Sequence, residues 1–341
     1  MKARLVTTIA ALVVASLPVD AWRAPALAPV TEVDAVGITV GDMDRALAFY
    51  TGVLPFKKVS DVEVSGRAHE LLTGVFGARL RIVRLQLGDE AIELMAFKAP
   101  PGRPYPPDTR ANDRWFQHIA IIVSDMDRAY AHLEASGVAH ASTGPQRLPD
   151  WNQGAGGIQA HYFRDPDGHF LEILSFPADK GDARWHRAEA APPLFLGIDH
   201  TAIVTSDTSR ALEFYNGTLG LRIAGAGVNY GVEQEHLNNV FGVRLRITTL
   251  RAPAGPGIEL LDYLTPGDGR PAPIDLRAND LAHWQTTLVT RGLTALFDLS
   301  LAKTFRLVSP DVVSIADGRL GFRRAALVRD LDGHAMRLVE R

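Results

Sequence analysis

Segments of this chain repeat one another at a distance of 165 residues. The hexapeptide RALAFY at residues 45–50 returns as RALEFY at 210–215, and VFGARLRI at 75–82 returns as VFGVRLRI at 240–247. GRPYPPDTRAND at 102–113 returns as GRPAPIDLRAND at 269–280, at the slightly longer distance of 167 residues. Three matches in the same order indicate a duplicated unit.

A second, shorter repeat lies within the first half of the chain. GDMDRALAF at residues 41–49 resembles SDMDRAYAH at 124–132, a spacing of 83 residues. The chain is therefore expected to contain four related modules. Four copies of so long a period argue against a solenoid and favour duplication of a supersecondary unit.

Each module starts with an apolar run that predicts a strand, followed by an amphipathic run that predicts a helix. In the third module these runs cover residues 198–205 and 208–219. Three β-rich runs follow, at 221–224, 245–250 and 257–264, so the predicted unit is βαβββ. In the even modules DPDG (165–168) and DLDG (330–333) predict turns, whose residues we interpret as structural.

A four-stranded sheet with one helix leaves one sheet face uncovered, so modules should pair edge to edge and curl around a cavity. We therefore predict an α+β fold, in which four βαβββ modules pair into two curved half-barrel sheets with helices outside. The predicted boundaries are a first domain at 33–176 (modules 33–97 and 115–176), a linker at 177–196, and a second domain at 197–341 (modules 197–264 and 281–341).

The N-terminal residues 1–21 have the pattern of a secretory signal peptide. Lys2 and Arg4 precede an apolar run from Leu5 to Leu17, and small residues follow up to Ala21. The run is shorter than the about 20 residues that cross a bilayer, so we expect export, to the periplasm of a bacterium, without a membrane anchor. A chain with 0 cysteines suits an exported protein. The alternative is a buried N-terminal helix.

The composition restricts the class of partner. A formal net charge of −3 without a basic stripe gives no field to recruit nucleic acid or anionic lipid. We therefore expect a small-molecule ligand, no nucleic acid and no membrane partner. Because four modules lie in one chain, a monomer is expected.

Alignment of the modules places polar residues at two equivalent strand positions. The first strands present Ala35, His118, His200 and Gln285, and the last strands present Glu93, Glu172, Glu259 and Arg337. A strict 165-residue offset would give His283 in the fourth module. We prefer Gln285, because Leu288 and Val289 then match Ile121 and Ile122.

These positions resemble the vicinal oxygen chelate superfamily, which includes glyoxalase I, methylmalonyl-CoA epimerase, extradiol dioxygenases and bleomycin-resistance proteins. The resemblance extends from about Val33 to the end of the chain. It implies that the first and last strands of a module lie side by side, and that His or Gln on one and Glu on the other hold a divalent metal ion in the cavity.

Elementary geometry agrees with this expectation, because side chains on neighbouring strands lie about 5 Å apart and can share one ion at about 2.1 Å. Imidazole and carboxylate suit Zn, Ni, Mn or Fe. If modules that are neighbours in sequence pair, both cavities hold an incomplete ligand set. If the inner modules pair with each other, one cavity holds all four predicted ligands of a single divalent ion: His118, Glu172, His200 and Glu259.

The second cavity of this crossed arrangement would place Arg337 beside Glu93. An arginine there would neutralise a carboxylate that has no metal to bind, whereas an unpaired buried carboxylate would cost several kcal/mol. We therefore predict the crossed pairing, with one metal site and one site that has lost its metal.

Other candidate residues concern the substrate: Trp151 in a loop over the cavity, and Tyr230, Asn238 and Arg246 near the third-module strands. The histidines outside the ligand positions, His161, His169, His236 and His334, are expected to be solvated.

A divalent ion with two His and two Glu can stabilise an enediolate, and Glu172 or Glu259 could act as the base for a proton next to a carbonyl. The predicted function is an exported, metal-dependent lyase or isomerase of the glyoxalase type. An Fe(II) dioxygenase of the extradiol type is the first alternative, although its facial triad needs only one carboxylate. A binding protein of the bleomycin-resistance type, without catalysis, is the second.

Overall fold

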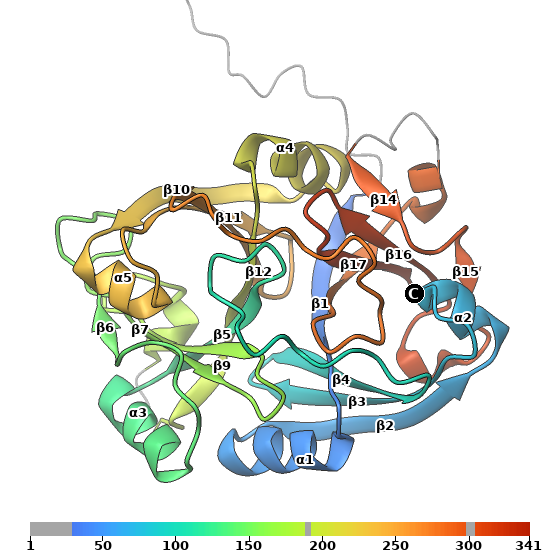
Figure 1. Cartoon of the computed structure of the whole chain (residues 1–341), viewed down its shortest axis with the longest axis horizontal. Helices are drawn as coiled ribbons and strands as arrows, with labels where there is room; N and C mark the ends of the chain where they lie inside the picture. The colour runs from blue at the N-terminus through green and yellow to red at the C-terminus, as the bar shows by residue number, and fades with distance from the viewer. Residues whose placement is uncertain (1–28, 188–191, 298–303) are drawn as a thin grey trace, which may run out of the picture.

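The computed structural model describes residues 29–187, 192–297 and 304–341. The predicted signal peptide at residues 1–21 therefore lies outside the described residues. Two curved sheets lie side by side, and helices cover the outside of the molecule (Figure 1). The predicted α+β class, with modules paired into two half-barrels, is confirmed.

The four modules contain the following elements. The first has β1 (Val30–Thr39), α1 (Met43–Ala48), the π-helix η2 (Phe49–Val53), β2 (Lys57–Ser65), α2 (Arg67–Thr73), β3 (Arg79–Leu87) and β4 (Glu90–Ala99). The second has β5 (Gln117–Val123), α3 (Met126–Ala135), β6 (Gln146–Arg147), β7 (Gln159–Arg164) and β8 (Phe170–Ser175), and the short helix η3 (Ala183–His186) follows it.

The third module has β9 (Phe195–Val204), α4 (Thr208–Leu212), the π-helix η4 (Glu213–Thr218), β10 (Arg222–Tyr230), α5 (Val232–Asn238), β11 (Arg244–Arg251) and β12 (Gly257–Thr265). The fourth has β13 (Trp284–Thr290), η5 (Leu293–Phe297), β14 (Phe305–Leu307), β15 (Val313–Ser314), η7 (Gly318–Leu320), β16 (Arg324–Asp330) and β17 (Ala335–Glu340). Strand β10 is longer than the predicted run at 221–224. It is solvent-exposed over most of its length and contains glycines, so an apolar pattern did not mark it.

Aspartates start the first helix of three modules. The side chains of Asp42, Asp125 and Asp207 accept hydrogen bonds from backbone N–H groups of the following turn. An acidic N-cap satisfies donors that the first turn leaves free. The repeated motif that begins GDMD or SDMD is therefore a strand-to-helix junction.

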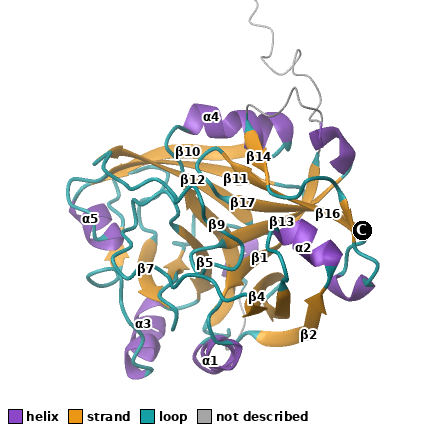
Figure 2. Cartoon of the chain, turned by 45° about the vertical axis from the view of Figure 1, so that its right-hand side comes forward, coloured by secondary structure: helices purple, strands orange, loops and turns teal. Residues whose placement is uncertain are grey.

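The order of the strands shows that the modules pair in the crossed arrangement. One sheet has the order β10-β11-β12-β9-β5-β8-β7-β6 and comes from the two inner modules. The other has the order β14-β16-β17-β13-β1-β4-β3-β2, with β15 on β16, and comes from the first and fourth modules. We call these the inner and outer half-barrels; neither sequence half, 33–176 or 197–341, forms a sheet by itself. Figure 2 shows β9 and β5 near β1 and β4 at the middle of the molecule.

The repeated GRP-RAND segments connect modules and interlock with each other. Asp113 accepts hydrogen bonds from the Arg270 backbone and guanidinium, at 3.0 Å from N and 2.6 Å from Nη2. Asp280 accepts equivalent bonds from Arg103, at 2.8 Å from N and 2.6 Å from Nη2. The equal spacing of Arg and Asp within each repeat thus produces two matching pairs, each of a buried aspartate with a partly exposed arginine, between chain segments far apart in sequence.

The repeated tyrosine of RALAFY and RALEFY links the two half-barrels. Tyr50 donates to Asp165 at 3.1 Å, and Tyr215 donates to Asp330 at 2.9 Å. The aspartates start the two predicted turns, in which Gly168 and Gly333 have φ of 97° and 105°. Those turns are therefore structural, because positive φ suits glycine.

The prediction that the remaining histidines are solvated is wrong for three of the four. His161, His169 and His334 are buried, and only His236 is exposed. His169 contacts Asp165 at 2.8 Å and the Leu281 carbonyl oxygen at 2.6 Å. A buried imidazole with a partner on each ring nitrogen is stable in a core. Asp165 lies four residues away in the sequence, but only the fold brings Leu281 near His169.

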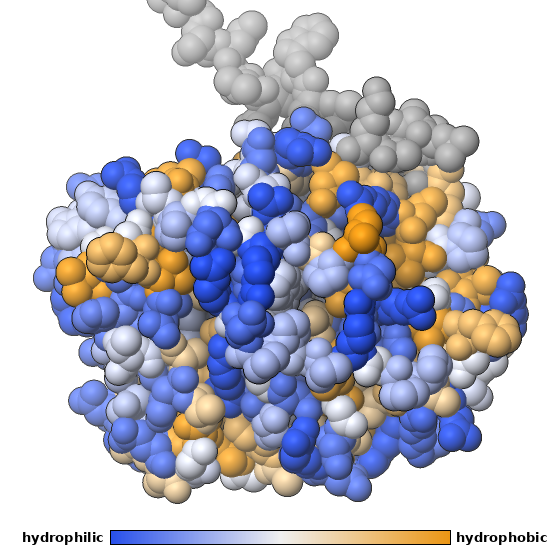
Figure 3. All heavy atoms as spheres, viewed as in Figure 1, coloured by the Kyte–Doolittle hydropathy of each residue, from blue (hydrophilic) through white to orange (hydrophobic). Residues whose placement is uncertain are grey.

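On the face seen in Figure 3 hydrophilic side chains predominate, and apolar ones gather at the left, over α5, and at the upper right. Val232 in α5 is exposed, as is Phe241 between α5 and β11. Within the described ranges no helix is long and apolar enough to cross a membrane.

The interlocked segments give a stability prediction. Replacement of Asp113, which is fully buried, by alanine should lower the free energy of unfolding by about 2–3 kcal/mol, because the backbone N–H groups of Arg110 and Arg270 lose their acceptor. Asp108 also pairs with Arg270 but is exposed, so Asp108→Ala should cost about 1 kcal/mol or less. Urea unfolding of both variants measures the difference, and equal losses would contradict the interlock.

Buried His283 should make stability fall in acid. Burial and the nearby Arg329 lower its pKa to about 3, and Arg329 donates to its Nδ1. The unfolded chain takes up this proton below about pH 6.5 whereas the folded chain does not, so stability is lost as pH falls from about 6.5 towards 3. His283→Gln should remove about 2–3 kcal/mol of the loss between pH 6.5 and 4.5, measured by urea unfolding at both pH values. The same slope in variant and wild type would refute the assignment.

Candidate metal centre

The central four strands of the inner half-barrel bring the predicted ligands together. β5 and β9 are antiparallel neighbours, with His200 opposite Ala120 and His118 opposite Ala202. β8 and β12 flank this pair in parallel and place Glu172 opposite Ala120 and Glu259 opposite Ala202. All four side chains therefore come from adjacent strands at about 4.8 Å spacing.

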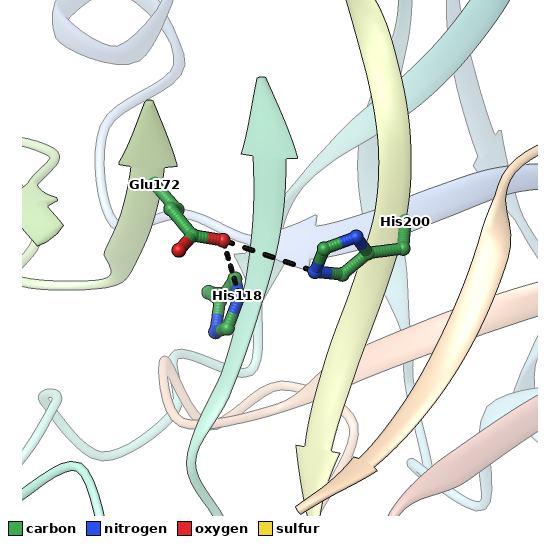
Figure 4. A group of neighbouring side chains, drawn as sticks. All are labelled: His118, Glu172 and His200. Carbon is green, nitrogen blue, oxygen red and sulfur yellow. Dashed lines mark hydrogen bonds and ion pairs between the residues drawn. The ribbon is translucent and has the colours of Figure 1, made fainter. Parts of the chain in front are cut away.

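Three of these side chains form a compact buried group, His118, Glu172 and His200, which we call the three-ligand group. Figure 4 shows them pointing toward one another from β5, β8 and β9. Nε2 of His118 lies 3.1 Å and Nε2 of His200 lies 3.8 Å from Oε2 of Glu172. One ligand atom from each residue lies within 4.8 Å of the others.

The donor set fits a divalent cation. Two ligand atoms that each lie about 2.1 Å from one ion are about 3.0–3.5 Å apart, close to the distances observed here. Residues His118, His200 and Glu172 are 1%, 5% and 4% exposed. Imidazole and carboxylate at this depth, with Nδ1 of His118 unpaired among the described residues, could hold such an ion.

Glu259, the fourth predicted ligand, lies beside the three-ligand group. Its Oε2 is 3.4 Å from Nε2 of His200, and its Oε1 accepts a hydrogen bond from Thr249 at 2.8 Å. Its side chain is 17% exposed, more than that of Glu172. Glu259 is thus the more accessible of the two carboxylates.

Asp199 contacts the other ring nitrogen of His200 and so fixes the orientation of the ring. Asp199 Oδ2 contacts Nδ1 of His200 at 3.0 Å, and Arg251 donates to both carboxylate oxygens of Asp199, each at 3.0 Å. Metal-binding histidines commonly have such a partner on the other ring nitrogen. Burial opposes protonation, but Glu259, Asp199 and Glu172 together raise the pKa of His200 to about 9. The pKa of Asp199 is lowered despite its burial, by His200 and Arg251.

The three-ligand group lies at a cavity of about 370 Å³ in the inner half-barrel. Leu148, Asn152 and Ala155 of the glycine-rich loop at 142–157 line it, which agrees with a loop over the cavity. Asn152 donates to Asn229 of β10 at 2.6 Å. Trp151 stacks on Tyr230 with ring centroids 4.4 Å apart, and both rings are about half exposed. These two predicted substrate residues therefore join the loop to β10 beside the cavity, rather than line it.

The structure places Arg246, a predicted substrate residue, away from this cavity. Side chains alternate along a strand, so Leu245 and Ile247 face the cavity while Arg246 lies on the other face and pairs with Asp262 at 3.0 Å. Asn238 is buried and accepts a hydrogen bond from Gln234, but it does not line the cavity either. Gln234, one helical turn earlier in α5, lines the cavity.

The equivalent position in the outer half-barrel has no metal-ligand set. Arg337 pairs with Glu93 there, as predicted, and Arg84 lies 3.4 Å from the same carboxylate. The cavity beside Gln285 and Arg337 is only about 20 Å³. Ala35 lies on β1 in the same sheet, opposite Thr287.

The strand register also decides between Gln285 and His283. Gln285 pairs with Gly37, which lies two residues after Ala35. In the same way His118 pairs with Ala202, which lies two residues after His200. Gln285 is therefore the fourth-module equivalent of His118. His283 contacts Gln285 at 3.3 Å from the preceding loop.

Sequence reasoning missed Asp199, Arg251, Asn229 and Gln234. Asp199 could have been noticed, because it precedes a predicted ligand and recurs as Asp34 one repeat earlier. The others have no such signal, because only the fold brings β10, α5 and the end of β11 to the cavity.

Comparisons with known proteins agree with this architecture. The family model described as "Glyoxalase/Bleomycin resistance protein/Dioxygenase superfamily" matches residues 32–173 and 197–337. A 2-epi-5-epi-valiolone epimerase of Actinomyces is 32% identical over 42% of this chain and 78% of its own length. Glyoxalase I of Saccharomyces cerevisiae is 26% identical over 34% of this chain and 33% of its own length. Glyoxalase I of Zea mays superposes with a TM-score of 0.56 at 15% identity, covering 92% of both chains, which shows a shared fold.

The metal site gives a direct prediction. Metal analysis after loading with Zn²⁺ or Mn²⁺ should find one ion per chain, because Arg337 occupies a ligand position in the outer half-barrel. His118→Ala and His200→Ala should each lower metal affinity by more than the about 10–100-fold expected for Asp199→Asn, which removes only an outer partner. His283→Ala serves as the control and should retain the ion. Two ions per chain, or an unchanged content in His118→Ala, would contradict the assignment.

Proposed function

The chain belongs to the glyoxalase/bleomycin resistance protein/dioxygenase superfamily, and on that basis we propose that it is a metal-dependent enzyme that moves a proton next to a carbonyl group. The proposed reaction is of the lyase or isomerase type on a small oxygenated substrate. The observation that carries the proposal is the buried three-ligand group at the cavity, with a second, more accessible carboxylate beside it.

The residues divide into two roles. His118, Glu172 and His200 would hold the ion, and Asp199 with Arg251 would keep the His200 ring in place. When bound, a divalent ion polarises a carbonyl oxygen and stabilises the negative charge that develops on it. Glu259 would take the proton from the adjacent carbon and return it, because its carboxylate is accessible and is oriented by Thr249.

The relatives' names support proton-transfer chemistry, since an epimerase and a glyoxalase I are among them. Export to the periplasm is also part of the proposal and depends only on the sequence of residues 1–21. A monomeric state is proposed because both half-barrels come from one chain.

One observation favours a second candidate, an extradiol-type Fe(II) dioxygenase. The compact group contains two histidines and one carboxylate, the ligand set of the facial triad, while Glu259 lies to one side. The two candidates differ in whether O₂ is consumed. The non-catalytic binding protein is less well supported, because a purely binding cavity gains little from four ionisable groups.

Exchange of carbon-bound hydrogen tests the proposal. The metal-loaded protein should catalyse deuterium incorporation from D₂O next to the carbonyl of hydroxy-ketones, followed by proton NMR. Glu259→Gln should lower the rate by about 10²–10⁴-fold with the metal retained, because it removes the base. Glu172→Gln should lose both metal and exchange.

Measurement of oxygen uptake tests the alternative function, the extradiol-type dioxygenase. The protein reconstituted anaerobically with Fe(II) should consume no O₂ with catechols. Uptake that depends on His118 and His200, without proton exchange on any hydroxy-ketone, would establish the dioxygenase and end the proton-transfer proposal.

A further inference from the structure

The charged side chains around the cavity of the inner half-barrel are mainly acidic. Within the described residues its lining contains four carboxylates (Glu172, Asp182, Asp199, Glu259) and a single guanidinium, that of Arg251. Four negative charges against one positive leave three, and a divalent ion reduces this to one while the histidines are neutral. Asp182 is largely exposed and lies 4.0 Å from Arg184, and without it these charges sum to about zero when metal is bound. The cavity therefore offers no net attraction to an anionic ligand even when it holds metal.

The single guanidinium is already engaged by the protein. Arg251 donates to the Asp199 carbonyl oxygen at 2.9 Å and to both of its carboxylate oxygens at 3.0 Å. An arginine with a bidentate carboxylate partner has little capacity for a second carboxylate or phosphate. The usual anchor for an anionic group is thus absent from the described lining.

Neutral hydrogen-bonding groups remain for a ligand. Gln234 is 2% exposed and lines the cavity, and its Oε1 is buried without a partner in the described part of the chain. Asn229 accepts from Asn152 through Oδ1, which leaves its Nδ2 group as a donor at the same cavity. A buried acceptor without a partner is unfavourable, and a ligand hydroxyl would satisfy it.

We propose that this cavity binds an uncharged hydroxy-carbonyl compound, with a hydroxyl donating to Gln234 and accepting from Asn229. Its carbonyl end would face the three-ligand group. This inference rests on the proposed function and specifies its substrate class. It excludes carboxylates, phosphates and glutathione conjugates, which bring negative charge into an acidic cavity.

Calorimetric titration of the zinc-loaded full chain tests the charge selectivity. L-erythrulose and dihydroxyacetone serve as uncharged probes. Hydroxypyruvate and the hemithioacetal of methylglyoxal and glutathione serve as anionic ones. We expect the uncharged probes to bind at least about tenfold more tightly than hydroxypyruvate. Asp182→Asn, which keeps an N-cap residue before η3, should reduce this preference.

A second pair of variants tests the hydrogen-bonding group. Gln234→Met keeps the side-chain length and should weaken erythrulose binding about tenfold, with zinc content unchanged. His236→Gln, on the exposed side of the same helix, is the matched control and should bind as wild type.

Three results would overturn the inference: anionic probes that bind as tightly as the uncharged ones, uncharged probes that all fail to bind, or Gln234→Met with unchanged affinity. Failure of the proposed function appears differently, as a chain that binds no metal or exchanges no carbon-bound hydrogen.

Discussion

The pairing of β5 with β9 is the interaction on which the site depends. These strands begin the second and third modules, and their antiparallel register sets His118 and His200 two residues apart along the seam. Neither histidine would have the other within reach if each sequence half folded on its own sheet. The three-ligand group is thus a property of the contact between modules, and it lies on the central strands of the sheet.

The same crossing explains why the longest repeats are not at the metal centre. The GRP-RAND segments and the RAL-FY tyrosines connect modules that belong to different half-barrels, through the Asp113 and Asp280 pairs and the Tyr50 and Tyr215 hydrogen bonds. These contacts hold the two half-barrels against each other. These contacts are equivalent in the two sequence halves, whereas the candidate metal ligands lie in only one of the two half-barrels.

Much of the fold and of the candidate site could be predicted, because both leave periodic signals in the sequence. Equivalent positions in four modules identified His118, Glu172, His200 and Glu259, and the exchange of a carboxylate for Arg337 indicated which modules share a cavity. The surroundings could not be predicted in the same way. Arg246 and Arg251 both lie on β11, and only the phase of the strand decides that Arg251 reaches Asp199 while Arg246 pairs with Asp262. Buried His169 looked like a surface residue because its partner, the Leu281 carbonyl oxygen, lies 112 residues away.

The pair of Arg337 and Glu93 has a consequence for the history of the chain. A return of the outer half-barrel to metal binding would need a carboxylate in place of Arg337 and an imidazole in place of Ala35. The first change alone would bury carboxylates without a cation, and the second alone would place an imidazole beside a guanidinium, so each single step is unfavourable. The ion pair therefore opposes any single substitution toward a metal-ligand set in the outer half-barrel.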